Sequence, residues 1–444
     1  MQGLVARIWG SGLIGNAVSL YAVQGLNYLV PLLLLPYLLR VLSVEGYGSI
    51  MFAQSVMGYA IILTEFGFNL TAARDISIAR DDAARVARIY WTTMAAKTLL
   101  LVVSLSAVAI LIVAVPGFRL QWPIFVASSV LVLGNIALPQ WYLQGLERLR
   151  DVAAIQAVSK CVVAASVVVL VRTRDDIWMA ALIMSAPQLV GAAAALLLRK
   201  SLAPAQFYRP TRQDIVQALR HSSHMFASIV STTLYLHTNT IFLGLMAGER
   251  QVALYSVGAR LVSFLQTVAS PIIQAVFPRA SLLFSQDPAR AWALLRRAAM
   301  LVLPAICLAS LALAIFAPWV VRLLGGSSYQ GAATIVRIMA AIPVLVTAAT
   351  GLSQTVMVNL GLTKQLFRIY LTIGCLNLLL LPALVAKFAA GGAAAALLIA
   401  ETLGPVLMIR VLRQSVSKNL SGRQASSPHK SHKSREPRKP RALE

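Results

Sequence analysis

Long uninterrupted runs of apolar residues constrain the fold of this chain more than any other feature. A transmembrane helix needs about 20 consecutive, mostly apolar residues, and the sequence offers about twelve such runs. They lie at 14–38, 48–70, 91–115, 122–143, 154–171, 177–198, 224–247, 253–278, 299–321, 333–357, 368–386 and 392–411. A β-barrel would show short alternating segments instead. The sequence therefore predicts an all-α polytopic membrane protein.

Composition supports this prediction, because only 12% of the 444 residues are charged and 58% are hydrophobic. Soluble domains carry about 25% charged residues, so this chain could not cover a water-exposed surface. A soluble enzyme, a secreted disulfide scaffold and a disordered chain are excluded. The three cysteines, Cys161, Cys307 and Cys375, lie in apolar runs and are expected to act as small buried hydrophobes.

The basic residues predict the orientation. The chain has 39 Lys and Arg against 15 Asp and Glu, and most of the bases fall in alternate loops and in the C-terminal tail. Because inner loops collect Lys and Arg, both termini are expected in the cytoplasm. The predicted outer loops are short, at 43–47, 116–121, 172–176, 248–251 and 322–332.

A weak internal repeat suggests two halves. Arg74, Asp82 and Arg85 follow the second run, and the same residue types follow the eighth run at the same spacing. We expect two pseudo-symmetric six-helix lobes around a central cavity, since parallel repeats of this kind place the substrate path between them. The predicted division is 1–200 for the first lobe, 201–222 for a cytoplasmic linker, 223–412 for the second lobe and 413–444 for a disordered basic tail.

Ionisable residues inside the predicted spans mark candidate functional positions. Each costs about 2.5–3.5 kcal/mol at mid-helix, so such residues usually face a wet cavity or a partner. They are Glu65, Lys97, Lys160, Arg260, Arg337 and Glu401, a set with more bases than acids. A cavity lined by them would suit an anionic ligand.

Arg260 belongs to a polar stripe along one helix face. Ser256, Arg260, Ser263, Thr267, Ser270 and Gln274 recur at steps of three and four residues. The stripe is either a seam of small polar residues between helices or one wall of a water-filled groove. The predicted substrate-binding set is Arg260, Lys97, Lys160, Arg337, Ser263, Thr267, Gln274, Asn27 and Asn239.

Two carboxylates are candidates for coupling transport to a proton or sodium gradient. Glu401 lies near the middle of the last span, and Glu65 lies near Lys97 in depth. Each candidate also has a structural explanation. Glu65 and Lys97 could form a neutralising ion pair, and Glu401 could pair with a buried Arg. Arg337 and Arg40 lie near the outer ends of their spans, where their side chains could reach the membrane surface. No phosphate loop, dinucleotide fingerprint or metal-spaced cluster is present, so neither enzyme activity, a cofactor nor a metal is expected.

Three segments resemble the O-antigen and exopolysaccharide flippases of the MOP (multidrug/oligosaccharidyl-lipid/polysaccharide exporter) superfamily. They are PYLLRVLSVEGYGSI (Pro36–Ile50), EFGFNLTAARDISIARDD (Glu65–Asp82) and PQWYLQGLERLR (Pro139–Arg150). The resemblance implies export of a polyprenyl-diphosphate-linked oligosaccharide from the inner to the outer leaflet by alternating access. It also implies contacts with membrane lipids and with glycan-assembly proteins, and it implies no binding of nucleic acid. Within these segments we interpret Arg40, Arg74, Trp141, Gln144, Gly145 and Glu147 as gating or structural residues.

Three alternatives remain open. A multidrug or cation antiporter of the same superfamily would share the architecture but would more often show buried carboxylates. A membrane glycan polymerase or ligase would need a sizeable outer loop, and a non-transporting scaffold would not need the polar stripe around Arg260.

Overall fold

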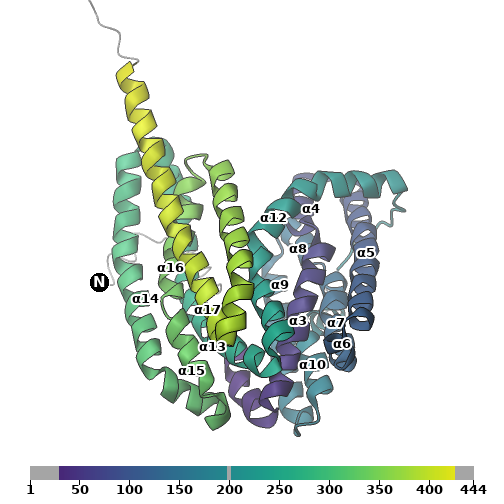
Figure 1. Cartoon of the computed structure of the whole chain (residues 1–444). Coiled ribbons are helices and arrows are strands. Elements are labelled where there is room, and N and C mark those ends of the chain that lie inside the picture. Colours follow the sequence, from purple (N-terminus) through teal and green to yellow (C-terminus); the bar gives the residue numbers. More distant parts are fainter. Residues whose placement is uncertain (1–29, 198–201, 426–444) are drawn as a thin grey trace, which may run out of the picture.

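The structure, a computed structural model, describes residues 30–197 and 202–425 as a bundle of helices (Figure 1). Within those residues every regular element is helical, which confirms the predicted fold class. The predicted outer loops lie together at one end of the bundle, the lower end in Figure 1, which we call the outer end; the opposite end is the inner end.

The N-terminal group comprises the helices up to Leu197. They are Val30–Val41, α3 (Val44–Glu65), α4 (Phe68–Ala79), α5 (Ala83–Ala114), α6 (Pro116–Arg119), α7 (Trp122–Ala137), α8 (Gln140–Gly145), α9 (Leu149–Leu170), α10 (Ile177–Ser185) and α11 (Pro187–Leu197). The predicted span 48–70 is broken between α3 and α4, because Phe66 and Gly67 adopt positive φ angles of 45° and 81°. Similarly, α10 and α11 meet at an angle of 51° just before Pro187.

The C-terminal group follows the linker. Its helices are α12 (Arg212–Ala247), α13 (Glu249–Gln286), α14 (Pro288–Gly325), η1 (Ser327–Tyr329), α15 (Gly331–Met339), α16 (Ile342–Thr350), the π-helix η2 (Gly351–Met357) and α17 (Thr363–Ala425). The predicted spans 368–386 and 392–411 are the two legs of α17, which Ala389 interrupts with φ 47° and ψ −125°.

Helix α12 is longer than the sequence suggested. Thr211 and Asp214 form a capping box that starts the helix at Arg212. The second half of the predicted linker and the span expected at 224–247 are therefore one continuous helix, and the predicted lobe boundary at 222/223 falls inside it. In Figure 1 the first turns of α12 run across the inner ends of α4 and α5 before the helix descends between the two groups.

Seven helices in the described residues are long and apolar enough to cross a membrane, or eight if the bent α10–α11 pair is one span. This confirms a multi-pass membrane protein. The helices α12 and α13 have the necessary length, but polar residues lower their hydropathy, and most of the predicted span 14–38 lies outside the described residues. The number of about twelve spans stays a prediction.

The apolar cores show where the two groups join. One large cluster near the outer end combines residues of both groups, for example Tyr47 and Ile50 of α3 with Val252 and Val257 of α13. The cluster around Phe68 and Trp141 contains buried residues of the N-terminal group alone, and the cluster around Met357 and Met408 contains those of the C-terminal group alone. The two groups thus share a core at the outer end. Towards the inner end their buried residues form separate cores, and Ile215, Ala218 and Leu219 of α12 pack on the N-terminal one.

Candidate functional site

Polar contacts reinforce the junction at the outer end. The Arg40 guanidinium donates a hydrogen bond of 2.6 Å to the carbonyl of Leu323 at the end of α14, where a cation suits the helix dipole. Arg250 pairs with Glu45 at 3.3 Å, and Gln121 donates a hydrogen bond to Glu249. Arg40, predicted as a gating or structural residue, contacts a backbone carbonyl of the other group.

Two glycines of α3 let the helices approach closely. A Cβ at Gly48 would overlap the carbonyl oxygen of Glu249 at the start of α13, and a Cβ at Gly58 would lie 2.5 Å from the His237 ring of α12. Small residues at such contacts allow backbone-to-backbone packing of membrane helices. The junction between the groups is therefore tight, and it depends on glycine at these positions.

Arg260 lies on α13 where that helix packs on α3. Its guanidinium is 3.9 Å from the Met51 sulfur, it is within electrostatic range of the Tyr47 hydroxyl, and it is partly buried. Among the described residues no carboxylate pairs with it. Arg260 is thus a partly buried cation at the contact between α3 and α13, with no counter-ion in the described part of the chain.

The rest of the predicted stripe follows Arg260 along α13. Ser256 is buried, Ser263 is exposed, and the half-buried Thr267 donates its hydroxyl hydrogen to the Ser263 carbonyl. The side chains of Ser270 and Gln274, and all of Asn27, lie outside the described residues.

Lys97 and Glu65 meet inside the N-terminal group. Lys97 is 1% exposed, and its ammonium donates to the Asn135 side-chain oxygen at 3.2 Å. The Asn135 amide in turn donates to Glu65 at 2.8 Å. The structure thus brings together the pair that the sequence offered as a neutralising alternative, with Asn135 of α7, which the sequence analysis did not single out, as the bridge. In this conformation Lys97 faces a protein partner.

Arg337 has a structural partner as well. Pro318 has no N–H, so it leaves the carbonyl of Ala314, one turn earlier in α14, without its helical hydrogen bond. The exposed Arg337 donates to that carbonyl at 3.3 Å. The structure places Arg337 on the outside of α15 against α14, away from the seam. Lys160 is half-buried on α9.

A second polar cluster lies in the C-terminal group. Asn239 of α12 donates to the Tyr255 hydroxyl of α13 at 3.1 Å, and both side chains are buried. Glu401 is within electrostatic range of the hydroxyls of Tyr255 and Tyr370. The side-chain oxygen of Asn239 and both amide atoms of the fully buried Asn377 find no hydrogen-bond partner within the described part of the chain. Buried polar atoms in this state usually bind water or an ion. Asn377 was missed by the sequence analysis because a lone amide in an apolar run carries no pattern.

Two of the segments that resemble the flippase family, Glu65–Asp82 and Pro139–Arg150, pack on each other. Trp141 of α8 is buried and stacks on Tyr90 at 5.5 Å between ring centroids. A Cβ at Gly145 would lie 2.8 Å from the Ala73 carbonyl oxygen of α4, and Glu147 pairs with Arg80 at 3.3 Å. These contacts support a structural role for the motif. The other two motif residues, Arg74 and Gln144, are exposed.

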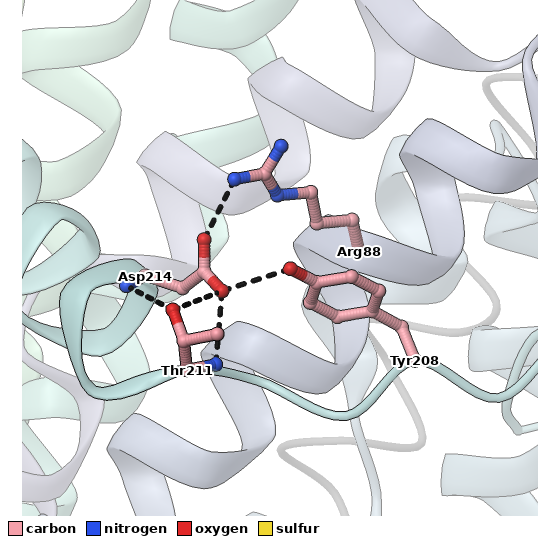
Figure 2. Close-up of polar contacts among 4 residues, drawn as sticks. All are labelled: Arg88, Tyr208, Thr211 and Asp214. Atoms are coloured by element: carbon pink, nitrogen blue, oxygen red, sulfur yellow. Dashed lines mark hydrogen bonds and ion pairs between the residues drawn. The ribbon is translucent and has the colours of Figure 1, made fainter.

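At the inner end the start of α12 is tied to the N-terminal group (Figure 2). Asp214 accepts hydrogen bonds from Arg88 of α5 at 2.7 Å, from the Tyr208 hydroxyl at 2.8 Å, and from the Thr211 amide and hydroxyl at 2.9 and 2.7 Å. The pKa of the Asp214 carboxyl lies well below its usual range because these hydrogen bonds stabilise its charged form, the one from Arg88 most and those from Thr211 and Tyr208 next. His221 and Asp75, 3.4 Å apart, line the adjoining cavity of about 590 Å³. No group of His, Cys, Asp and Glu that could hold a metal occurs in the described residues.

Comparison with known proteins supports the resemblance found in the sequence. Residues 13–284 match the model of the family described as "Polysaccharide biosynthesis protein". The chain belongs to this family.

Curated relatives extend over most of the chain. It is 29% identical over 400 residues to a "Putative O-antigen transporter" of Escherichia coli (strain K12), covering 90% of this chain and 96% of the relative. A protein of the same description from Shigella dysenteriae is 26% identical over 398 residues, covering 90% and 99%. Both of these relatives are thus described as transporters.

Solved structures show the same fold. The lipid II flippase MurJ in its inward closed conformation superposes with a TM-score of 0.72 at 11% identity, covering 90% of this chain and 87% of that one. An inward-facing MATE family transporter of the MOP superfamily superposes with a TM-score of 0.63 at 14% identity, covering 90% and 100%. The fold of this protein is therefore of the MurJ and MATE type.

Proposed function

We propose that this protein is a flippase that moves a polyprenyl-diphosphate-linked oligosaccharide, an O-antigen or exopolysaccharide repeat unit, from the inner to the outer leaflet. The observation that carries the proposal is Arg260, in a chain of the polysaccharide biosynthesis family. Its guanidinium lies at the contact between the two helix groups, and no carboxylate of the described residues pairs with it. The bacterial inner membrane, with both termini in the cytoplasm, is part of the same proposal.

The chemistry of the substrate explains the choice of residues. Burying an unpaired diphosphate in hydrocarbon would cost tens of kcal/mol. A guanidinium at the seam replaces water around the phosphates, and hydroxyls such as Ser263 provide hydrogen bonds to sugars. The prenyl chain stays in the bilayer. The shared core at the outer end and the separate cores at the inner end fit a state that accepts substrate from the inner side.

Ion coupling is assigned to the cluster around Glu401. Its carboxylate lies within electrostatic range of Tyr255 and Tyr370. Helices α12 and α17 also hold the side-chain oxygen of Asn239 and the amide of Asn377, which find no hydrogen-bond partner among the described residues. A proton or a sodium ion bound in this cluster would change how the C-terminal helices pack. The Glu65–Asn135–Lys97 network is a second coupling candidate, because protonation of Glu65 would leave the buried Lys97 charge less well compensated.

A deletion strain tests the transport proposal. Without the protein, lipid-linked oligosaccharide should accumulate on the inner leaflet and surface glycan should disappear. Wild-type protein should restore surface glycan, whereas Arg260→Ala should not restore it. The matched control is Arg119→Ala, which changes an exposed arginine at the outer end and should restore surface glycan like the wild type. Normal glycan in Arg260→Ala cells with membrane-inserted protein would remove Arg260 from the mechanism.

The similarity to MATE transporters favours one second candidate, a drug or cation antiporter. The same strains distinguish the two, because an antiporter predicts normal lipid-linked oligosaccharide distribution and increased sensitivity to cationic dyes after deletion.

A further inference from the structure

The two legs of α17 form a basic pocket at their inner ends. The pocket has a volume of about 480 Å³, and Arg368 of the first leg and Arg410 of the second both line it. Each arginine is 21 residues from the break at Ala389, so each lies about 30 Å along its helix from that break. This distance is the thickness of the hydrocarbon core. Both guanidiniums are therefore expected at the level of the inner-leaflet headgroups.

The charge of this pocket is uncompensated. Between Asp287 and Glu436 the sequence contains a single acidic residue, Glu401, and no carboxylate from the described part of the chain lines the pocket. Within the described residues, neither Arg368 nor Arg410 makes an ion pair or a side-chain hydrogen bond, and both are exposed. Two guanidiniums that face one space without an acid repel each other, so an anion between them would stabilise both.

The remaining lining fits a lipid better than a free ion. Gln365 and Gln414 add amide donors beside the guanidiniums, whereas Ile369 and Leu407 provide an apolar wall. Behind that wall the two legs are held together by buried apolar side chains, so packing fixes the backbones that carry the two arginines. Donors at one level and an apolar surface next to them match a phosphate headgroup and the first carbons of its chain.

We propose that Arg368 and Arg410 form a binding site for the phosphate group of an inner-leaflet lipid. The shared chemistry is a phosphate ester attached to a hydrocarbon chain, whether in an anionic phospholipid or in a polyprenyl phosphate. The site is separate from the Arg260 seam, and lipid binding there does not require that the protein transports the lipid it holds.

The test measures lipid binding to the purified full chain by native mass spectrometry. Phosphatidylglycerol, a polyprenyl monophosphate and the neutral phosphatidylcholine are titrated separately. A basic residue at the headgroup level contributes about fivefold to affinity, so Arg368→Gln with Arg410→Gln should weaken binding of phosphorylated lipid about 25-fold. The control Arg413→Gln removes an exposed arginine of the same helix that does not line the pocket, and affinity should stay closer to the wild-type value than in the double variant.

Each outcome decides the assignment. Loss of binding in the double variant, with recovery in Arg368→Lys and Arg410→Lys, supports the site. If the double variant loses binding of both phosphatidylglycerol and the polyprenyl phosphate, the site binds anionic lipids in general. If it loses binding of the polyprenyl phosphate alone, the site binds the class of carrier lipid to which the proposed substrate is attached. Unchanged affinity in the double variant overturns the proposal, as does displacement of lipid by an equal concentration of inorganic phosphate. A protein that binds lipid here but fails the flipping assay would contradict the proposed function and leave this site intact.

Discussion

Gly48→Ala should shift the protein away from the conformation described here. The added Cβ would overlap the backbone carbonyl of Glu249, which cannot rotate aside as a side chain could. The first turn of α13 must therefore separate from α3. Overpacking of this kind costs about 1–3 kcal/mol, which lowers the ratio of this conformation to one with separated outer ends about 5- to 150-fold.

Distance measurements at the outer end can detect this shift. Spin labels at Arg174 and Ser328, two exposed positions in outer loops of the two groups, report the separation by double electron–electron resonance in nanodiscs. Gly48→Ala should add or enlarge a population at longer distance. Gly117→Ala is the matched control, because a Cβ at that outer-end glycine meets no atom within 4 Å.

The refuting result is specific. If Gly48→Ala gives the same distance distribution as Gly117→Ala and the wild type, the contact between α3 and α13 does not hold the outer end closed. In that case this contact would not control the separation of the two groups at the outer end, even if the variant still lost transport.

Three further predictions concern packing and charge. Gly145→Ala should cost about 1–3 kcal/mol of stability by overpacking against α4, seen as a lower melting temperature in detergent; an unchanged melting temperature would remove the packing argument. Because the folded pKa of Asp214 is depressed, its carboxylate stabilises the protein above the unfolded pKa of about 4, and this stabilisation disappears as the pH falls through the folded value. Asp214→Asn should therefore lower the melting temperature at pH 7 and flatten its acid dependence below about pH 4; an acid dependence equal to that of the wild type would speak against the network. Arg337→Ala should reduce stability, because the Ala314 carbonyl loses its donor, while transport per folded molecule stays normal; the reverse pattern would instead favour substrate binding by Arg337.

The features that could be predicted from the sequence are those with a strong periodic or compositional signal. The apolar runs identified the helical membrane fold, and the polar stripe singled out Arg260, which lies beside Met51 of α3. Both follow from the geometry of an α-helix, which places residues three and four positions apart on one face.

The features that sequence patterns missed depend on long-range packing. Asn135 lies far in sequence from Glu65 and Lys97, so nothing local marks it as their bridge. The role of Arg337 depends on a carbonyl freed by Pro318 in a neighbouring helix. The continuity of α12 through Ser222 was hidden because a polar segment next to an apolar run looks like a loop followed by a span, whereas the contacts with α4 and α5 keep it helical.

Reconstituted transport tests the central claim most directly. Purified protein in proteoliposomes is supplied with a fluorescent polyprenyl-diphosphate sugar on the side facing its inner end, and a membrane-impermeant quencher reads the lipid that reaches the opposite leaflet. Wild-type protein should move the lipid, and Arg260→Ala with the same amount of inserted protein should not. Equal movement by the two proteins, or none by the wild type under a proton or a sodium gradient, would contradict the account.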